Sequence, residues 1–304
     1  MTRSPFAHWE DAAKPRDEAD WPTHTPRIER AGLPPFFQFS QNSMQDYVDC
    51  PRRFQLRYRL RQKWPAPHSQ PIEDHERLMA QGAEFHLLVQ RHLGGMPVET
   101  LRPHDEPLAT WWANYLRYPP ADLPTRRLLP EVSLSMPLAG QRLMAKFDLL
   151  ALDPGERAVI VDWKTSLRRP QRGDLAQRLQ TRVYQAVLAE AGAALFGGPL
   201  APEQITFLYW FAQDPLNPEI FRYDADQHAA NLAELAGLIE EITTRDDAIW
   251  PLTWDERHCK YCVYRSLCDR GVNAGPLEEM GLSLAEDVDI DFDFDLEDVD
   301  EIAF

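Results

Sequence analysis

The chain has 304 residues, 44% of them hydrophobic, which is enough to bury the core of one large domain or two small ones. Its 32 basic and 48 acidic residues give a net charge of −16. Twelve of the acidic residues and no Lys or Arg lie in 278–301, so the rest of the chain has 36 acidic and 32 basic residues, a net charge of only −4. Neither a signal peptide nor a membrane span is evident, which predicts a soluble, cytoplasmic protein with no membrane partner.

The first part of the chain is predicted to be an arm followed by helices. Residues 1–35 are rich in proline and charge, which is typical of a flexible arm. Ser43 with Asp46 three residues later is a capping-box variant, and the helix that it begins is expected to be interrupted at Cys50-Pro51. Hydrophobic periodicity predicts two further helices, over 72–93 and 108–118.

The middle of the chain changes to the alternating pattern of strands. Three successive strands joined by turns are predicted over 131–136, 142–152 and 158–163. A helix, two strands and a last helix follow over 175–195, 204–211, 219–223 and 225–244. This order predicts one mixed α/β domain over 36–272, followed by a disordered acidic tail over 273–304.

The four cysteines of the chain have the spacing of a metal site. Cys50 stands alone, whereas Cys259, Cys262 and Cys268 form a C-x2-C-x5-C triplet near the end of the predicted domain. In a reducing compartment such thiols favour metal binding over disulfides. Zinc and a [4Fe-4S] cluster both fit four thiolates, and either would join the two ends of the domain.

Two carboxylates and a lysine have the spacing of a metal-dependent phosphodiesterase. Asp148 lies on the second predicted strand, and Asp162 and Lys164 lie on the third. Neighbouring antiparallel strands can bring both carboxylates together as oxygen ligands for Mg²⁺ or Mn²⁺, and Lys164 emerges on the same strand face as Asp162. The alternative is that an acid before a turn and a D-x-K at a strand end are ordinary surface features.

Further motifs appear in a fixed order and carry a family resemblance. The matching segments are Cys50-Pro-Arg-Arg-Phe, Gly82-x-x-x-His86, Asp148 with Asp162-Trp-Lys164-Thr-Ser, Gln180-x-x-x-Tyr184 and the cysteine triplet. Over residues 38–270 this set resembles the PD-(D/E)XK nuclease superfamily, in particular its RecB/AddB-like branch and CRISPR-associated relatives. The resemblance implies a restriction-endonuclease-like core, a mixed central sheet flanked by helices, with an N-terminal helical part and a C-terminal iron–sulfur staple.

The resemblance also implies a role for each matching residue. The Mg²⁺ or Mn²⁺ ion would be held by His86, Asp148, Asp162 and the backbone carbonyl of Trp163. Lys164 would act on the attacking water, and Gln180 and Tyr184 would line the site, with Glu131 as a further acidic member. The cysteines Cys50, Cys259, Cys262 and Cys268 would hold a [4Fe-4S] cluster rather than zinc. Taken singly, His86, Gln180 and Tyr184 fit ordinary core or helix-face positions equally well.

One departure from the family pattern lies beside the first aspartate. The family usually has a glycine two or three residues before it, where this chain has Met144-Ala-Lys146. Period two places Lys146 on the same strand face as Asp148, where it would contact phosphate or perturb metal binding.

Basic residues predict a nucleic-acid surface with little sequence preference. Six Lys or Arg residues lie in 52–63, and five arginines follow the catalytic strand: Arg168, Arg169, Arg172, Arg178 and Arg182.

We therefore expect a metal-dependent DNA nuclease, an exonuclease on single-stranded or frayed ends, in DNA repair, recombination or defence. The alternatives are a non-catalytic DNA-binding or scaffold subunit of a helicase–nuclease complex and a nuclease acting on RNA. The acidic tail is either a solubilising segment, a docking segment for a helicase or a single-stranded-DNA-binding partner, or a DNA mimic that folds back over the basic groove.

Overall fold

The computed structural model describes residues 32–62, 70–166, 169–246, 248–259 and 262–270, with side chains of the 70–93 helix from Arg77 onward. The chain divides into two units, Met1–Gly32 and Leu33–Phe304, and the description below concerns the second. The predicted arm, except for its last residues, and the predicted acidic tail lie outside the described residues. In the part of the chain that the structure describes, no helix is both long and apolar enough to cross a membrane.

The first helices form next to Cys50, and their start differs from the prediction. Helix α1 covers Gln41–Asp49 and is capped by Ser40, whose side chain accepts from the Ser43 N–H at 3.2 Å while Ser43 Oγ accepts from the Ser40 N–H at 2.9 Å. The predicted Ser43–Asp46 box is therefore wrong, because Asp46 forms an ion pair with Arg53 instead. After Cys50 the chain continues as α2, Pro51–Phe54, and a π-helical turn over Gln55–Arg59.

The two predicted helices that follow are confirmed and form one layer. Helix α3 spans Gln70–Leu93 and α4 spans Glu106–Arg117. Asp105 caps α4 by accepting from the Leu108 N–H at 3.0 Å. A short 3-10 turn over Val98–Thr100 connects the two helices.

The centre of the domain is a mixed six-stranded sheet in the order β1-β3-β4-β5-β6, with β2 paired to β3. The strands cover Gln38–Phe39, Arg127–Leu138, Gln141–Asp153, Arg157–Lys164, Ile205–Phe211 and Glu219–Arg222. The predicted β2–β3–β4 meander is confirmed as antiparallel, and β4 pairs with β5 in parallel. Strand β1 was not predicted; its two residues run parallel to the start of β3.

The segment predicted as one helix over 175–195 is divided into three helices. They are α5 over Arg172–Gln177, α6 over Leu179–Ala191 and α7 over Ala193–Phe196. The break after α5 occurs because Arg178 is extended, with ψ of 139°. A 3-10 turn over Pro202–Gln204 precedes β5, and the last long helix, α8, covers Ala225–Thr244 as predicted.

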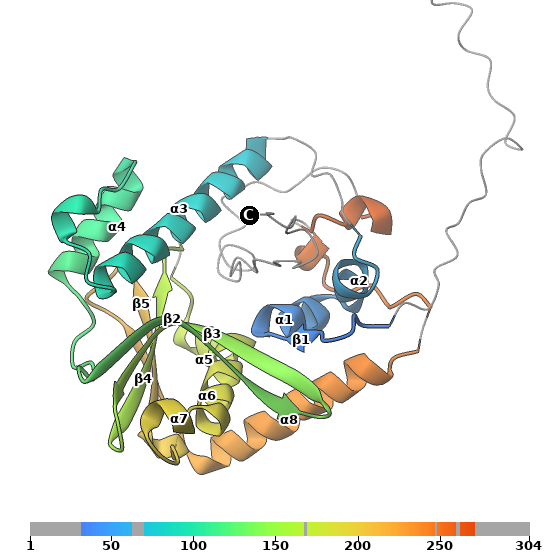
Figure 1. The fold of residues 1–304 in the computed structure, drawn as a ribbon. Coiled ribbons are helices and arrows are strands. Elements are labelled where there is room, and N and C mark those ends of the chain that lie inside the picture. The colour runs from blue at the N-terminus through green and yellow to red at the C-terminus, as the bar shows by residue number, and fades with distance from the viewer. Residues whose placement is uncertain (1–31, 63–69, 167–168, 247, 260–261, 271–304) are drawn as a thin grey trace, which may run out of the picture. The chain divides into compact units, whose positions relative to one another are not determined.

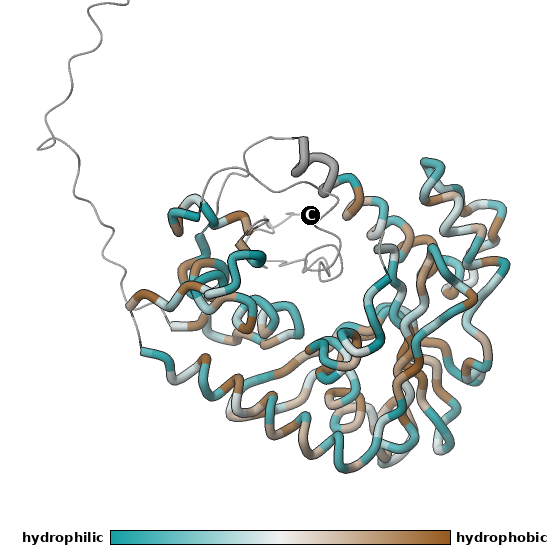
Figure 2. Tube along the Cα trace, turned by 180° about the vertical axis from the view of Figure 1, so that it is seen from behind, coloured by the Kyte–Doolittle hydropathy of each residue, from teal (hydrophilic) through white to brown (hydrophobic). Residues whose placement is uncertain are grey.

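Hydrophobic side chains form a core on each face of the sheet. Helices α6 and α8 contribute Val183, Val187, Leu235 and Ile239 to one core, whereas α3 and α4 contribute Phe85, Val89, Leu108 and Trp111 to the other. Figure 1 shows these two helix layers on opposite sides of the strands, and Figure 2 shows hydrophobic stretches along the sheet between them. The structure is thus the mixed α/β architecture, with a central mixed sheet between helices, that the sequence predicts.

The C-terminal segment returns to the helices around Cys50. Pro251 O accepts from the Arg52 N–H at 3.1 Å, and Tyr264 Oη donates to Gln62 O at 3.0 Å. The ring of Trp250 stacks on Phe54 with centroids 5.7 Å apart. This segment ends in two 3-10 turns, Glu256–Cys259 and Arg265–Cys268. Residues at the two ends of the domain therefore pack together.

Candidate active site

An interruption in the pairing of β2 with β3 sets the direction of the Asp148 side chain. On β3, Phe147 and Leu150 belong to one core and Leu149 to the other, so strict side-chain alternation fails at Asp148. Opposite it on β2, Glu131 has a φ of 54°, in the left-handed region that is uncommon for residues other than glycine. The ladder pairs the residues on either side of these two but not the two themselves. The side chain of Asp148 is therefore directed toward the end of β4 rather than into a core.

Asp148 is fixed by groups from two elements. Its Oδ2 accepts from the backbone N–H of Trp163 at 2.8 Å, and its Oδ1 lies 3.4 Å from His86 Nδ1. The other ring nitrogen of His86 lies 3.0 Å from the carbonyl oxygen of Trp163. A histidine on α3 thus binds both the carboxylate on β3 and the backbone at the end of β4. Three predicted metal-site groups lie together here.

Close approach of α3 to β4 depends on Gly82. A Cβ atom at this position would lie 3.0 Å from Thr165 Oγ1, which is tighter than ordinary van der Waals contact. Gly82 lies four residues before His86, so both residues occupy the same face of α3. The G-x-x-x-H spacing is explained physically: the glycine lets the helix reach the strand, and the histidine one turn later reaches Asp148.

A second group of predicted residues lies at the same end of β4, on the side of α6. Lys164 Nζ is 3.1 Å from Asp162 Oδ2 and donates to Gln180 Oε1 at 2.9 Å. Gln180 Nε2 donates to Asp162 Oδ1 at 2.6 Å. All three side chains are buried. Gln180 therefore holds the acid and the lysine in one triangle.

Two residues of this end were not found from the sequence. Tyr209 is the register partner of Asp162 on the parallel strand β5, and its ring lies 5.4 Å from Lys164 Nζ. Thr181 Oγ1 lies 2.8 Å from Tyr209 Oη, which in turn donates to Gln180 Oε1 at 3.4 Å. Only the pairing of β4 with β5, which is distant in sequence, could have indicated Tyr209.

Tyr184, predicted to line the site, has its ring in the core. The ring is 1% exposed and packs against Phe147 and Phe207, with centroids 5.1 and 5.9 Å away. Phe147 directly precedes Asp148, so Tyr184 supports the strand that carries this carboxylate.

The charges at the site perturb one another. Burial by itself would lower the pKa of His86, but the negative charges of Asp148, Asp162 and Glu131 outweigh burial and raise that pKa to about 9. Burial would raise the pKa of Asp148, but the charge and hydrogen bond of His86, helped by the Trp163 N–H and Lys164, hold it below its usual value. Groups held in their charged forms in this way are typical of functional sites.

The donor atoms fit a hard divalent cation. One ligand atom each from His86, Glu131 and Asp148 lie within 4.8 Å of one another. Carboxylate oxygens are preferred by Mg²⁺, and imidazole is also accepted by transition metals such as Mn²⁺. Lys146, from the segment that departs from the family pattern, lies with its Nζ 2.7 Å from Glu131 Oε2. The ion would thus bind between groups of β2, β3 and α3, next to the triangle around Asp162.

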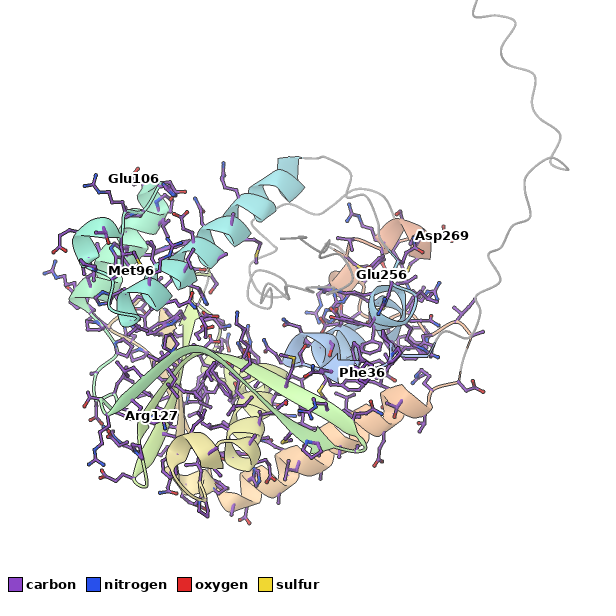
Figure 3. All side chains as sticks on the ribbon, viewed as in Figure 1. Phe36, Met96, Glu106, Arg127, Glu256 and Asp269 are labelled. Carbon is purple, nitrogen blue, oxygen red and sulfur yellow. The ribbon has the colours of Figure 1, made fainter. Side chains whose placement is uncertain are left out.

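The four cysteines gather at the other end of the domain. Cys50 is buried at the junction of α1 and α2, and the other three lie in and beside the C-terminal 3-10 turns. Glu256 and Asp269, at the ends of this cysteine-bearing segment, lie beside α2 in Figure 3. All four cysteines are free thiols.

The thiols influence one another electrostatically. Burial, helped by the charges of Cys262, Cys50 and Cys259, raises the pKa of Cys268 to about 11. Burial likewise raises the pKa values of Cys259 and Cys262. Thiols grouped in this way lose their protons when a metal binds them. The donor set therefore fits a thiolate-bound metal centre.

Arginines expected to contact phosphate are engaged within the protein. Arg53 is buried and pairs with Asp46 at 2.7 Å and Asp49 at 2.6 Å. Arg169 pairs with Asp214 and Glu219, and further pairs join Arg57 to Asp46, Arg172 to Glu219 and Arg182 to Glu234. Lys63 and Arg168 lie outside the described residues. These pairs join separate elements of the domain, so the arginines have a structural role.

Comparison with known proteins places the chain in a family. No curated protein matches it. The crystal structure of a putative exonuclease from Eubacterium rectale is 12% identical with a TM-score of 0.44, over 72% of this chain and 85% of that one. The crystal structure of SSO0001 is 14% identical with a TM-score of 0.37, over 78% and 87%. Likeness at these levels carries no functional argument. A family profile, by contrast, matches residues 38–269, which include every residue of the site, and the chain belongs to the PD-(D/E)XK nuclease superfamily.

Proposed function

We propose that the protein is a metal-dependent deoxyribonuclease that degrades single-stranded or frayed DNA ends as an exonuclease in repair, recombination or defence. The observation that carries the catalytic proposal is the meeting of His86 and Asp148 with the Asp162–Lys164–Gln180 triangle at the end of β4. Because the chain belongs to a nuclease superfamily, the proposed reaction is phosphodiester hydrolysis.

The residues divide the chemistry among them. His86, Asp148, Asp162 and the Trp163 carbonyl would hold Mg²⁺ or Mn²⁺, with Glu131 beside them. When bound there, such an ion would lower the pKa of its water and polarise the phosphate. Lys164 orients the attacking water and offsets the charge that develops on the phosphate. Gln180 keeps the Lys164 ammonium in position, and the ring of Tyr209 packs against this ammonium.

The test is cleavage of end-labelled single-stranded DNA by the full chain with Mg²⁺ or Mn²⁺, compared with Asp162→Asn and Lys164→Met. Asp122→Asn is the matched control, because this exposed acid pairs with Arg157 outside the site. We expect metal-dependent cutting that both site variants lose and the control retains. Uncut DNA with retained binding by the wild type would favour a scaffold role, and cutting of RNA alone would reassign the substrate.

We also propose that Cys50, Cys259, Cys262 and Cys268 hold a [4Fe-4S] cluster, which would place the chain in the RecB/AddB-like branch. The support is the set of four free thiols at the contact between the two ends of the domain. Thiolates of this kind bind iron–sulfur clusters as well as zinc. Iron, acid-labile sulfide and zinc in anaerobically purified protein decide between them: about four irons and four sulfides per chain are expected, and one zinc without iron would reject the cluster.

The acidic segment 278–301 is proposed to recruit a helicase or a single-stranded-DNA-binding partner. Its support is sequence alone, because acidic and apolar residues alternate over 288–296. Removing 278–304 is expected to abolish partner binding while leaving cleavage of free single-stranded DNA intact. Unchanged partner binding by the shortened chain would reject the proposal.

A further inference from the structure

Lys146 places an ammonium group against one member of the cation site. Its Nζ lies 2.7 Å from Glu131 Oε2, with the side chain of Lys146 45% exposed and that of Glu131 18% exposed. Glu131 also belongs to the group of donor atoms, with those of His86 and Asp148, that lie within 4.8 Å of one another. One carboxylate therefore serves both the lysine and the candidate cation site.

The backbone of Glu131 is held in place. Glu131 lies on β2 between two residue pairs of the β2–β3 ladder, and its backbone has a φ of 54°. The ladder on both sides holds this unusual conformation in place. By contrast, Lys146 has a long, half-exposed side chain that can change partner at low energetic cost. Because Glu131 is the more buried partner, we expect exchange at the pair to occur mainly by movement of Lys146.

An ammonium group and a divalent cation on the same carboxylate repel each other, and in a partly buried site this repulsion is only weakly screened. The ion therefore binds Glu131 fully only when Lys146 has turned away. A nucleic-acid substrate brings a phosphate to this place, and a phosphate is a natural partner for a lysine. The same movement then satisfies the lysine and frees the carboxylate.

We propose that Lys146 couples divalent-cation binding to nucleic-acid binding. Its ammonium neutralises Glu131 in the free enzyme and shifts to a substrate phosphate when DNA binds, which releases Glu131 to the ion. The inference rests on the proposed function, since it takes nucleic acid as substrate and a divalent cation at His86 and Asp148. By linkage, DNA raises the affinity for the cation by the same factor by which the cation raises the affinity for DNA.

The test measures Mn²⁺ binding to the full chain by electron paramagnetic resonance of free Mn²⁺, with and without a single-stranded phosphorothioate oligonucleotide that resists hydrolysis. The wild type is compared with Lys146→Met and Glu131→Gln. Arg142→Met is the matched control, because Arg142 is an exposed cation on the same strand that binds Ser135 instead. A methylphosphonate oligonucleotide, which lacks backbone charge, controls for the phosphate. Circular dichroism checks that each variant is folded.

The wild type is expected to bind Mn²⁺ on the order of tenfold more tightly with the charged oligonucleotide, which is a usual size for coupling between two sites. Lys146→Met should bind Mn²⁺ about tenfold more tightly than the wild type without DNA and gain little from DNA. Glu131→Gln should bind Mn²⁺ more weakly, and Arg142→Met should match the wild type. Equal Mn²⁺ affinity of Lys146→Met and the wild type, or no effect of the charged oligonucleotide on the wild type, would overturn the inference. If the nuclease proposal alone fails, DNA stays uncut in the cleavage assay while these binding differences persist.

Discussion

The catalytic end and the cysteine end of this domain are held together in different ways. At the catalytic end, Asp148, Asp162 and Lys164 are fixed by hydrogen bonds on long strands of the central sheet. At the cysteine end, the segment before the 3-10 turns meets α2, where Trp250 stacks on Phe54 and Pro251 O accepts from the Arg52 N–H. Regular elements of the sheet position the reacting groups, whereas at the cysteine end buried ion pairs of Arg53 with Asp46 and Asp49 join α1 to α2.

The largest expected effect on stability concerns the cysteine end. Arg53→Met removes the partner of two buried carboxylates, Asp46 and Asp49. Removing one partner of a buried ion pair costs about 3–5 kcal/mol. Here Asp49 loses its arginine, whereas Asp46 keeps Arg57. Arg57→Met is the matched control, because the half-exposed Arg57 also pairs with Asp46 and should cost less than about 1 kcal/mol. Urea unfolding of both variants measures the difference, and equal losses would show that the buried pairs are not what holds this end.

The next effect is on catalysis at the other end. Lys164→Met removes the ammonium group that faces Asp162 and Gln180. Loss of one group that stabilises developing charge lowers kcat about 10²–10³-fold. Single-turnover cleavage of labelled DNA measures this. A decrease in kcat of less than about tenfold would show that Lys164 does not act in the chemical step.

Loss of one thiol should lower the iron content and the stability of the protein but leave metal binding at the catalytic end unchanged. Cys50→Ser is expected to abolish the iron content and lower the thermal midpoint by about 5–10 °C, which corresponds to a few kcal/mol for a domain of this size. The hydrogen bonds around Asp162 are unaffected by this change, so Mn²⁺ binding should persist. Full iron content in Cys50→Ser would show that Cys50 is not a ligand.

A smaller effect tests the approach of α3 to β4. Gly82→Ala pushes the helix away from Thr165, and we expect Mn²⁺ binding to weaken severalfold because His86 moves with it. Gly237→Ala on α8 is the control, because a Cβ there meets nothing within 4 Å. In the control, the usual helix preference for alanine should stabilise the fold by about 0.5–1 kcal/mol. Unchanged metal affinity in Gly82→Ala would mean that the close approach does not set the position of His86.

The smallest expected effect depends on pH. Glu241 accepts from Tyr47 Oη at 2.6 Å, and this bond, joined by Arg245, lowers its pKa. A lowered pKa stabilises the fold above the ordinary pKa of Glu, and the contribution disappears as the pH falls through the folded-state pKa. Glu241→Gln should therefore cost about 0.2–1 kcal/mol at neutral pH, and this cost should disappear as the pH falls through the lowered folded-state pKa of Glu241. A pH-independent difference in chemical unfolding would contradict this assignment.

The sequence predicted the regular elements well because their patterns are local. The meander and the helices α3, α4 and α8 follow from apolar periodicity and turn residues. Strand β1 was missed because a pairing of two residues leaves no periodic signal. The break after α5 was missed because nothing in the local pattern marks Arg178 as extended.

For the site, the motifs identified residues that the structure does bring together, namely His86 with Asp148 and Asp162 with Lys164 and Gln180. The irregular backbone at Glu131 and the contribution of Tyr209 depend on pairing between strands, which no local pattern reports. The arginines were assigned to phosphate from their charge alone. The acidic partners of Arg169, Arg172 and Arg182 lie far along the chain, as the pair of Arg182 with Glu234 shows.

The measurement that tests the central claim most directly is the release of nucleotides from single-stranded DNA labelled at either end, by the full chain in Mg²⁺ and in EDTA. The account predicts release in Mg²⁺ that starts at one end, stops in EDTA and is lost in Asp162→Asn. Nucleotide release that is equal in Asp162→Asn and the wild type, or that continues in EDTA, would contradict it.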